Sequence, residues 1–331
     1  MNGEYAELNS IGKLVTLSII SCLLHIGQSH AENAPVFSHE RAGFSIKFKD
    51  EISPYTIIGV FLMPDETITI EAVDNDPAIR YTLRLTGGTA ERLDNKRWTY
   101  RANDKPGLYP AIVYNATRTD SVVMNIFVKV PRTEKRNGRI NGYRIGEYPR
   151  TPLRGQPEYN PPRGFIEVTP ENENTYISPH FQLKQFLCKQ ADDYPKYVVL
   201  HERLLLKLQL VLERVNEKGY YANTFVVMSG YRTPFYNRAI GNVRYSRHVY
   251  GDAADIFIDI RRPHGMMDDL NGDGKIDQRD AAILYDIIDE LYPKPWYKPF
   301  IGGLGLYKER PGVRGPFVHI DARGNRARWG R

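Results

Sequence analysis

The segment Ser246-Arg-His-Val-Tyr-Gly-Asp-Ala-Ala-Asp255 decides the fold of the C-terminal half, because it places a histidine and an aspartate where both can hold a metal ion. A second stretch, Phe317-Val-His-Ile-Asp321, is typical of a strand and adds another histidine. Together they offer His248, Asp255 and His319 as three zinc ligands. Two imidazoles and one carboxylate leave the fourth corner of a tetrahedron for water, which indicates a hydrolytic zinc site.

The residues around these ligands favour a firmly held site. Gly251 permits a tight turn after His248, and Ala253 leaves room beside an ion. Residues 256–260 are apolar enough for a buried strand, so Asp255 is expected at a strand start, where a sheet can hold a ligand still. By itself the spacing leaves a second interpretation open, in which the histidine belongs to a solvated acidic loop.

The ten residues Ser246–Asp255 follow the pattern S-x-H-x-x-G-x-A-x-D, and the sequence SGYRTP precedes them at residues 229–234. Both resemble the zinc D-alanyl-D-alanine carboxypeptidases and related murein endopeptidases. Residues 177–181 also resemble the segment that opens the catalytic domain of the endopeptidase branch, so the resemblance runs from about residue 140 to the end. It implies an α+β domain of the hedgehog/DD-peptidase type with a mainly antiparallel sheet, zinc on the three ligands named above, and peptidoglycan as the substrate.

The sequence departs from this family at one position. Several members carry a catalytic carboxylate three residues before the last zinc-binding histidine, and Pro316 stands there in this chain. The nearest acid is Asp321, on the same side of an extended strand as His319. Two roles stay open for Asp321, either the general base or a partner that fixes the tautomer of a ligating imidazole. Glu309 and Asp252 are the other candidate bases.

Three further residues are expected in the substrate pocket. Arg232 follows the apolar run 225–228, so it is predicted just past the end of a strand. A guanidinium there can bind a substrate carboxylate or stabilise an oxyanion, and the resemblance implies such a role. Ser246 and Tyr231 are predicted as pocket walls or hydrogen-bond donors.

Residues 269–280 follow the calcium-loop pattern of an EF-hand. The twelfth position is Asp, not the usual Glu, which resembles dockerin loops more than sensor loops. Because only one loop is present inside an enzyme-like domain, a structural calcium site is expected, with a merely acidic turn as the alternative. The predicted ligands, one through its backbone carbonyl, are Asp269, Asn271, Asp273, Lys275, Asp277 and Asp280.

The N-terminus predicts export. Residues 14–26 are apolar, follow Lys13 and precede Ser29-His-Ala31, so residues 1–31 are interpreted as a signal peptide. The apolar run continues past Cys22, which argues against a lipoprotein anchor. No later stretch is long and apolar enough for an integral membrane segment. After signal removal Cys188 is the one remaining cysteine, and its apolar neighbours predict a buried thiol.

Hydrophobic patterning divides the rest of the chain. Residues 32–130 contain short alternating runs, which predict a β-sandwich with an immunoglobulin-like arrangement that serves for spacing or docking. Residues 131–164 are rich in Pro, Gly and Arg and are interpreted as a linker that wraps the catalytic domain. Residues 165–331 form the expected peptidase domain, with helices predicted over 181–190, 199–218 and 281–291 and strands over 225–228, 254–260 and 317–321.

The net charge of +6 over 331 residues is modest and its basic residues are dispersed, so a nucleic-acid partner is not expected. The charge suits an anionic cell-wall polymer. The sequence therefore predicts a secreted or periplasmic zinc peptidase that acts on peptidoglycan, either as a D,D-carboxypeptidase or as a crosslink endopeptidase. Two alternatives remain, a catalytically silent wall-binding protein that keeps the zinc scaffold and a calcium-dependent adhesion protein. No feature of the sequence sets the oligomeric state.

Overall fold

Strands outnumber helices in the part of the chain that the computed structural model describes, which is residues 37–76, 78–116, 119–260 and 263–331. The signal peptide predicted over residues 1–31 lies outside these ranges. Among the described residues, no helix is both long enough and apolar enough to cross a bilayer. The mixed composition, with few helices, agrees with the α+β class.

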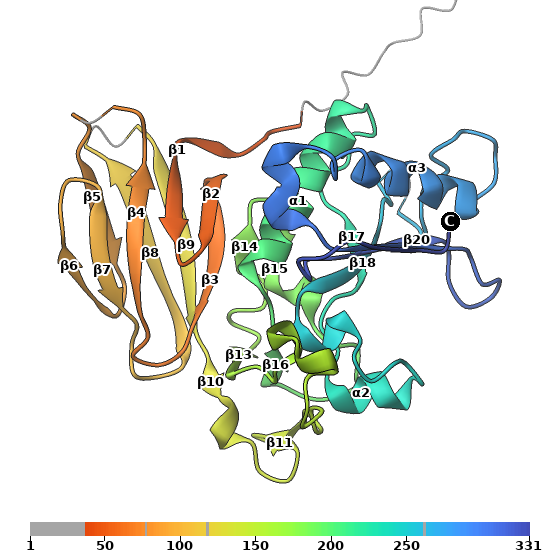
Figure 1. Ribbon diagram of the computed structural model, residues 1–331, viewed down its shortest axis with the longest axis horizontal. Helices are drawn as coiled ribbons and strands as arrows, with labels where there is room; N and C mark the ends of the chain where they lie inside the picture. The colour runs from red at the N-terminus through yellow and green to blue at the C-terminus, as the bar shows by residue number, and fades with distance from the viewer. Residues whose placement is uncertain (1–36, 77, 117–118, 261–262) are drawn as a thin grey trace, which may run out of the picture. The chain divides into compact units, whose positions relative to one another are not determined.

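Two sheets form from the alternating runs of the N-terminal part (orange to yellow in Figure 1). Side chains from both sheets share one apolar core, which includes Phe48, Ile70, Trp98 and Met124. In β4 the residues at every second position, such as Ile70, turn inward while their neighbours stay accessible, as a half-buried strand requires. The strands of the first sheet are, in spatial order, β2 (Glu51–Tyr55), β1 (Arg41–Phe48), β4 (Thr67–Val73), β7 (Arg97–Arg101) and β6 (Thr89–Arg92). The strands of the second sheet are, in spatial order, β3 (Ile57–Leu62), β9 (Ser121–Val128), β8 (Gly107–Asn115) and β5 (Tyr81–Leu85).

All strand pairs in these two sheets are antiparallel except β3 with β9, which is parallel. The strands expected from the alternating sequence are therefore present. The immunoglobulin-like arrangement and the boundaries of this region as a separate domain stay predictions.

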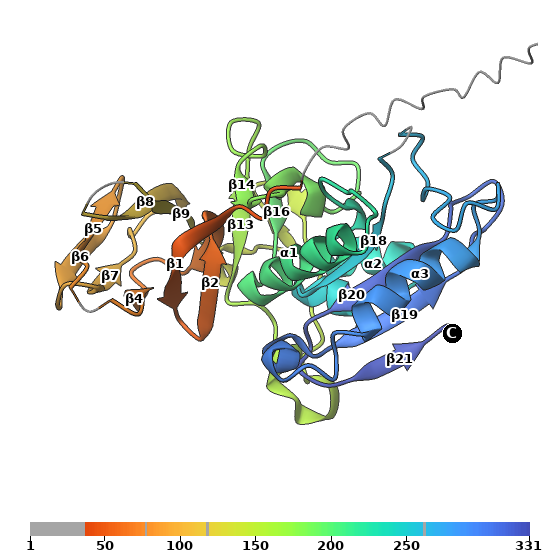
Figure 2. The same ribbon diagram turned by 90° about the horizontal axis from the view of Figure 1, so that it is seen from above.

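The C-terminal sheet has five strands in the order β17 (Val226–Ser229), β18 (Ala253–Phe257), β20 (Phe317–Asp321), β19 (Gly303–Tyr307) and β21 (Ala327–Trp329). Its pairs are antiparallel apart from the parallel pair of β19 and β21. Helix α3 (Gln278–Asp289) packs against β19 and β20, and α1 (Glu202–Glu217) packs against α3 (Figure 2). Both helices lie on the same side of the sheet.

Helix α1 is buried on more than the one face that the leucine pattern indicates. Leu204, Leu208 and Val211 are buried as predicted, yet Lys207 and Gln209 are fully buried as well. The Nζ of Lys207 donates to the backbone carbonyl of Asp321 (2.6 Å), so α1 supports the strand that carries a predicted zinc ligand.

The prediction of a helix over residues 181–190 is wrong. This segment forms β15 (Phe181–Gln182), a 3₁₀ turn over Leu183–Phe186 and then extended chain. Its apolar side chains are buried on several sides, and the carbonyl of Phe186 accepts from the backbone N–H of Tyr231 (3.0 Å), so tertiary contacts outweigh helical ones. Cys188 is buried, as expected.

The Pro- and Arg-rich segment 131–164 packs against the C-terminal half of the chain through its aromatic side chains. Tyr143, Tyr148 and Tyr159 are buried in the same core as the C-terminal sheet. The remaining elements around this core are α2 (Pro234–Ala239), β10 (Val130–Pro131), β11 (Arg139–Ile140), β12 (Tyr143–Arg144), β13 (Gly164–Val168), β14 (Tyr176–Ser178) and β16 (Lys196–Val198).

Candidate metal centre and cleft

One row of residues crosses all five strands of the C-terminal sheet. Ser229 is paired with Asp255, Asp255 with His319, His319 with Gly305, and Gly305 with Trp329. Residues opposite each other on neighbouring strands project from the same face. The sheet itself therefore brings two predicted zinc ligands together and places an indole at the end of the row.

The third ligand, His248, comes from the 3₁₀ turn Arg247–Tyr250 just before β18. Its Nε2 lies 3.2 Å from Asp255 Oδ1 and 3.1 Å from His319 Nδ1, and the latter two atoms are 2.8 Å apart. Donors on a tetrahedral zinc ion stand about 3.3 Å from one another. The two imidazoles and the carboxylate thus fit zinc in chemistry and in spacing, and all three residues are buried.

Each imidazole is held by its other nitrogen. His248 Nδ1 lies 2.7 Å from the carbonyl of Gly230, and His319 Nε2 lies 3.2 Å from Asp321 Oδ2. These acceptors favour a proton on the outer nitrogen and leave the inner nitrogen as the metal donor. Burial lowers the pKa of His248. Burial acts the same way on His319, but its hydrogen bonds to Asp255 and Asp321 outweigh it and raise the pKa of His319 to about 9.

Arg232 is bound to the carboxylate ligand. Its Nη2 lies 2.5 Å from Asp255 Oδ2, and its Nε donates to Ser229 Oγ (2.7 Å). Burial favours a protonated Asp255, but His248 and His319 override burial and lower the pKa of Asp255. Arg232 also lines the cleft above the ligands, so it is placed both to orient Asp255 and to meet a substrate.

Asp321 is fully buried and both of its oxygens are engaged. Oδ1 accepts from the backbone N–H of Gly303 (2.7 Å), and Arg323 donates to both oxygens, with 2.5 Å from Nη2 to Oδ2. Burial opposes ionisation, but the hydrogen bonds from His319 and Arg323 dominate and lower the pKa of Asp321. These contacts favour the orienting role over that of a general base.

The other two candidate bases lie apart from the three ligands. Asp252 is buried in an ion pair with Arg247, and Glu309 is not among the residues that line the cleft. Pro316, three residues before His319, is buried directly before β20.

The cleft over the ligands has a volume of about 460 Å³ and an aromatic wall that sequence reasoning missed. The indole of Trp329 lies 5.1 Å from the His319 ring, between centroids, and can reach it because Gly305 has no side chain. Trp329 lies in an Arg-rich C-terminal segment whose sequence does not predict a strand. Its place in the cleft therefore follows only from the pairing of β21. The aromatic residues of the wall, apart from the ligand histidines, are Tyr159, Tyr245, Tyr307, Phe317 and Trp329.

The two predicted pocket walls differ. Ser246 lines the cleft. Tyr231 is 1% exposed, and its hydroxyl lies 2.9 Å from the hydroxyl of Tyr148 in the core. The prediction that Tyr231 contacts substrate is therefore corrected. In an extended segment neighbouring side chains point to opposite sides, so Tyr231 turns away where Arg232 faces the cleft.

The predicted calcium loop is folded by its own side chains. Asp269 accepts from the backbone N–H groups of Gly272 and Gly274 (2.8 Å each), and Asp280, fully buried, accepts from that of Leu270 (2.8 Å). Arg279 forms ion pairs with two other predicted ligands, Asp273 and Asp277 (2.7 Å each). Among the described residues the loop carboxylates do not converge as the zinc-type ligands do. Calcium binding stays a prediction.

A second convergence of potential ligand atoms involves Asp259, His264 and Asp268. The carboxylate of Asp259 accepts from the backbone N–H groups of His264 and Gly265, and Asp268 accepts from that of Ile260 (2.9 Å). These bonds link residues 259 and 260, just after β18, with residues 264, 265 and 268. We interpret the group as a loop clamp.

Comparison with known proteins connects the region around the ligands with a peptidase family. No curated protein matches the chain. The family model described as Peptidase M15 matches residues 179–265, a range that includes Arg232, His248 and Asp255 and ends before His319. This match and the three zinc-type donors gathered in a cleft support a similarity of residues 179–265 to the Peptidase M15 family, of the zinc D-Ala-D-Ala carboxypeptidase type.

Proposed function

We propose that this protein is a secreted zinc peptidase that hydrolyses D-amino-acid-containing peptide bonds of peptidoglycan, as a D-Ala-D-Ala carboxypeptidase or as a murein crosslink endopeptidase. The convergence of His248, Asp255 and His319 in one cleft carries the proposal. The Peptidase M15 match supports peptide hydrolysis and a cell-wall substrate. The predicted signal peptide over residues 1–31 would take the enzyme to that substrate.

The residues around the ligands have separate tasks. A zinc ion held by the three ligands would polarise the scissile carbonyl and lower the pKa of water. Asp321 orients the imidazole of His319, and Arg232 orients Asp255. The guanidinium of Arg232, which lines the cleft, can bind a substrate carboxylate or the oxyanion of the transition state. Ser246 and the aromatic wall shape the space for the peptide.

The test is digestion of purified sacculi with zinc-loaded protein, followed by mass spectrometry of the released muropeptides. Loss of terminal D-alanine would identify a carboxypeptidase, and loss of crosslinked dimers would identify an endopeptidase. The His248→Ala variant and a chelated sample serve as controls and should leave the muropeptides unchanged. Identical profiles for wild type and His248→Ala would contradict the proposal and favour a wall-binding protein without activity.

A further inference from the structure

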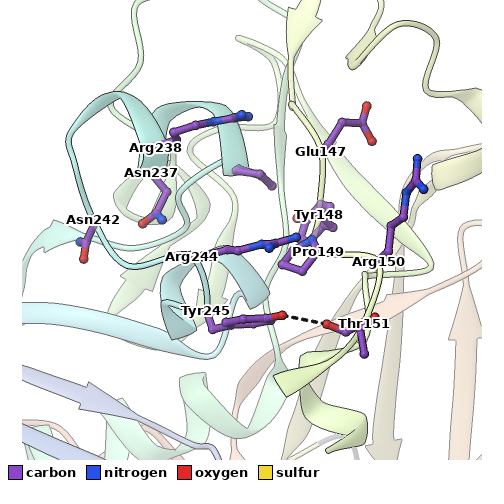
Figure 3. A pocket seen from close by; sticks show the side chains of 11 residues that line it. Glu147, Tyr148, Pro149, Arg150, Thr151, Asn237, Arg238, Asn242, Arg244 and Tyr245 are labelled. Carbon is purple, nitrogen blue, oxygen red and sulfur yellow. Dashed lines mark hydrogen bonds between the residues drawn. The ribbon is translucent and has the colours of Figure 1, made fainter. Parts of the chain in front are cut away.

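A second and larger hollow, whose lining residues are drawn in Figure 3, adjoins the zinc cleft. Its volume is about 840 Å³, and it lies between residues 147–151 and the segment from α2 to residue 245. Asn242, Arg244 and Tyr245 line both the hollow and the cleft, so the two spaces share a wall. A peptide with one bond at the zinc ligands can therefore extend into this hollow, which we call the arginine pocket.

The arginine pocket carries positive charge that no acid neutralises. Arg150, Arg238 and Arg244 line it and are exposed, and within the described ranges none of them forms an ion pair. The single acid of its wall, Glu147, is paired with Lys135 (2.6 Å). In Figure 3, Arg238 and Arg244 extend from the α2 side toward the opposite wall.

Three arginines of the neighbouring cleft differ from those of the arginine pocket because they form ion pairs. Arg232, Arg247 and Arg323 are each bound to an aspartate of the protein. Their charges are used to hold the site together. Since the three guanidiniums of the arginine pocket lack such partners and gather around one hollow, they are free to bind an anion. Guanidinium groups bind carboxylates through paired, charge-assisted hydrogen bonds.

The pocket is built on supported walls. Tyr148 anchors one wall through its hydroxyl, which donates to the carbonyl of Val249 (3.1 Å). The hydroxyl of Tyr245 donates to the carbonyl of Thr151 (2.9 Å), and this bond joins the two walls (Figure 3). A preformed wall loses little conformational freedom when a ligand binds.

One buried acceptor in the same wall indicates that the occupant also carries donors. Asn237 is 2% exposed, and its Nδ2 donates to the carbonyl of Val243 (2.9 Å). Its Oδ1 has no hydrogen-bond partner among the described residues. A buried acceptor without a partner costs free energy. A peptide offers amide N–H groups beside its carboxylates, whereas a bare phosphate chain does not.

We propose that Arg150, Arg238 and Arg244 bind carboxylates of the peptide whose scissile bond lies in the zinc cleft. The enzyme would thereby select wall peptides whose acidic groups are free over those in which they are amidated. This inference rests on the proposed peptidase function for the position of the scissile bond. The binding of acidic peptide at the arginine pocket is measurable without turnover.

The experiment compares one muropeptide with free carboxylates and the same muropeptide after conversion of those carboxylates to amides. The test variant replaces all three arginines by glutamine. Its matched control, Arg80→Gln/Arg84→Gln/Lys105→Gln, removes the same charge from exposed positions in the strands and connections of the N-terminal part. Turnover is measured with zinc-loaded protein. Equilibrium binding of both peptides is measured in the His248→Ala background, with and without the arginine substitutions.

In wild type we expect kcat/KM to be about 100-fold higher for the acidic peptide than for the amide, since each charged hydrogen bond contributes roughly tenfold or more. The triple arginine variant should lose this preference, and the charge control should keep it. Equal loss on both peptides, or no loss, would overturn the proposal while the peptidase function stands. If no peptide is cleaved, the proposed function fails, and the binding difference alone decides the inference. Weakened binding of a phosphate-rich wall polymer, with acidic-peptide binding unchanged, would also overturn it.

Discussion

Asp255 and His319 lie directly opposite each other on β18 and β20, with 2.8 Å between Oδ1 and Nδ1. Their distance is therefore set by the spacing of two antiparallel strands and not by the conformation of a loop. Only His248 approaches from outside the sheet, and the carbonyl of Gly230 holds its ring. A site on rigid elements is positioned before an ion binds, which favours tight and selective binding.

Replacing His319 with alanine is expected to abolish zinc binding and peptidase activity, because two donors remain on the protein where three are needed. Zinc content after gel filtration, measured by atomic emission, should fall from about one ion per chain to near zero. His264→Ala is the matched control, since His264 belongs to the loop clamp. A fall in zinc content for His264→Ala alone would show that the metal site has been misplaced.

Asp321→Asn separates the two roles left open by the sequence. If Asp321 orients His319, zinc affinity should fall by about 10- to 100-fold, and excess zinc should restore much of the activity. A general base would behave otherwise, with unchanged zinc affinity and a low kcat at every zinc concentration. Competition with a fluorescent chelator gives the affinity, and initial rates at saturating zinc give kcat.

Gly305→Ala tests the contact between the sheet and the aromatic wall. A Cβ at this position overlaps the indole of Trp329, so the ring must move away from His319 or β21 must shift. We expect a loss of about 1–3 kcal/mol in the free energy of unfolding, together with reduced kcat/KM. Adding Trp329→Leu should restore stability but not activity. Recovery of both would show that the indole has no part in substrate binding.

Stability should depend on pH through Lys207. Burial lowers the pKa of Lys207 from its ordinary value of 10.5 to about 7. Between these values the unfolded chain binds one more proton than the folded chain, so the free energy of unfolding rises with pH, by at most roughly 1.4 kcal/mol per pH unit. Lys207→Met should remove this rise, measured by urea denaturation from pH 6 to 9.5. Parallel curves for the two proteins would contradict the buried, neutralised lysine.

The parts of the site that sequence reasoning predicted depend on local patterns. Asp255 and His319 lie in short segments whose sequence is typical of strands. Their side chains are recognisable as metal ligands without knowledge of their neighbours in space. Trp329 reaches the cleft through the parallel pairing of β21 with β19. Arg150 lines the arginine pocket, where the bond between Tyr245 and Thr151 joins its segment to the opposite wall. Both contacts involve residues far apart in the sequence. The helix expected over residues 181–190 failed for the same reason, because contacts from residues far along the chain determine its backbone.

Calcium binding by residues 269–280 is tested by thermal unfolding with and without calcium. A ligand at 100 times its dissociation constant adds about 2.7 kcal/mol to stability if it binds only the folded state, so Tm should rise with calcium concentration. Asp269→Ala should abolish the rise, because Asp269 supplies the first predicted ligand and also holds the loop backbone. Asp104→Ala, an exposed acid outside the loop, is the control. The ion pairs of Arg279 with Asp273 and Asp277 must open for calcium to bind, so Arg279→Ala should strengthen binding. If calcium shifts the Tm of wild type and Asp269→Ala equally, the loop is an acidic turn folded by its own hydrogen bonds.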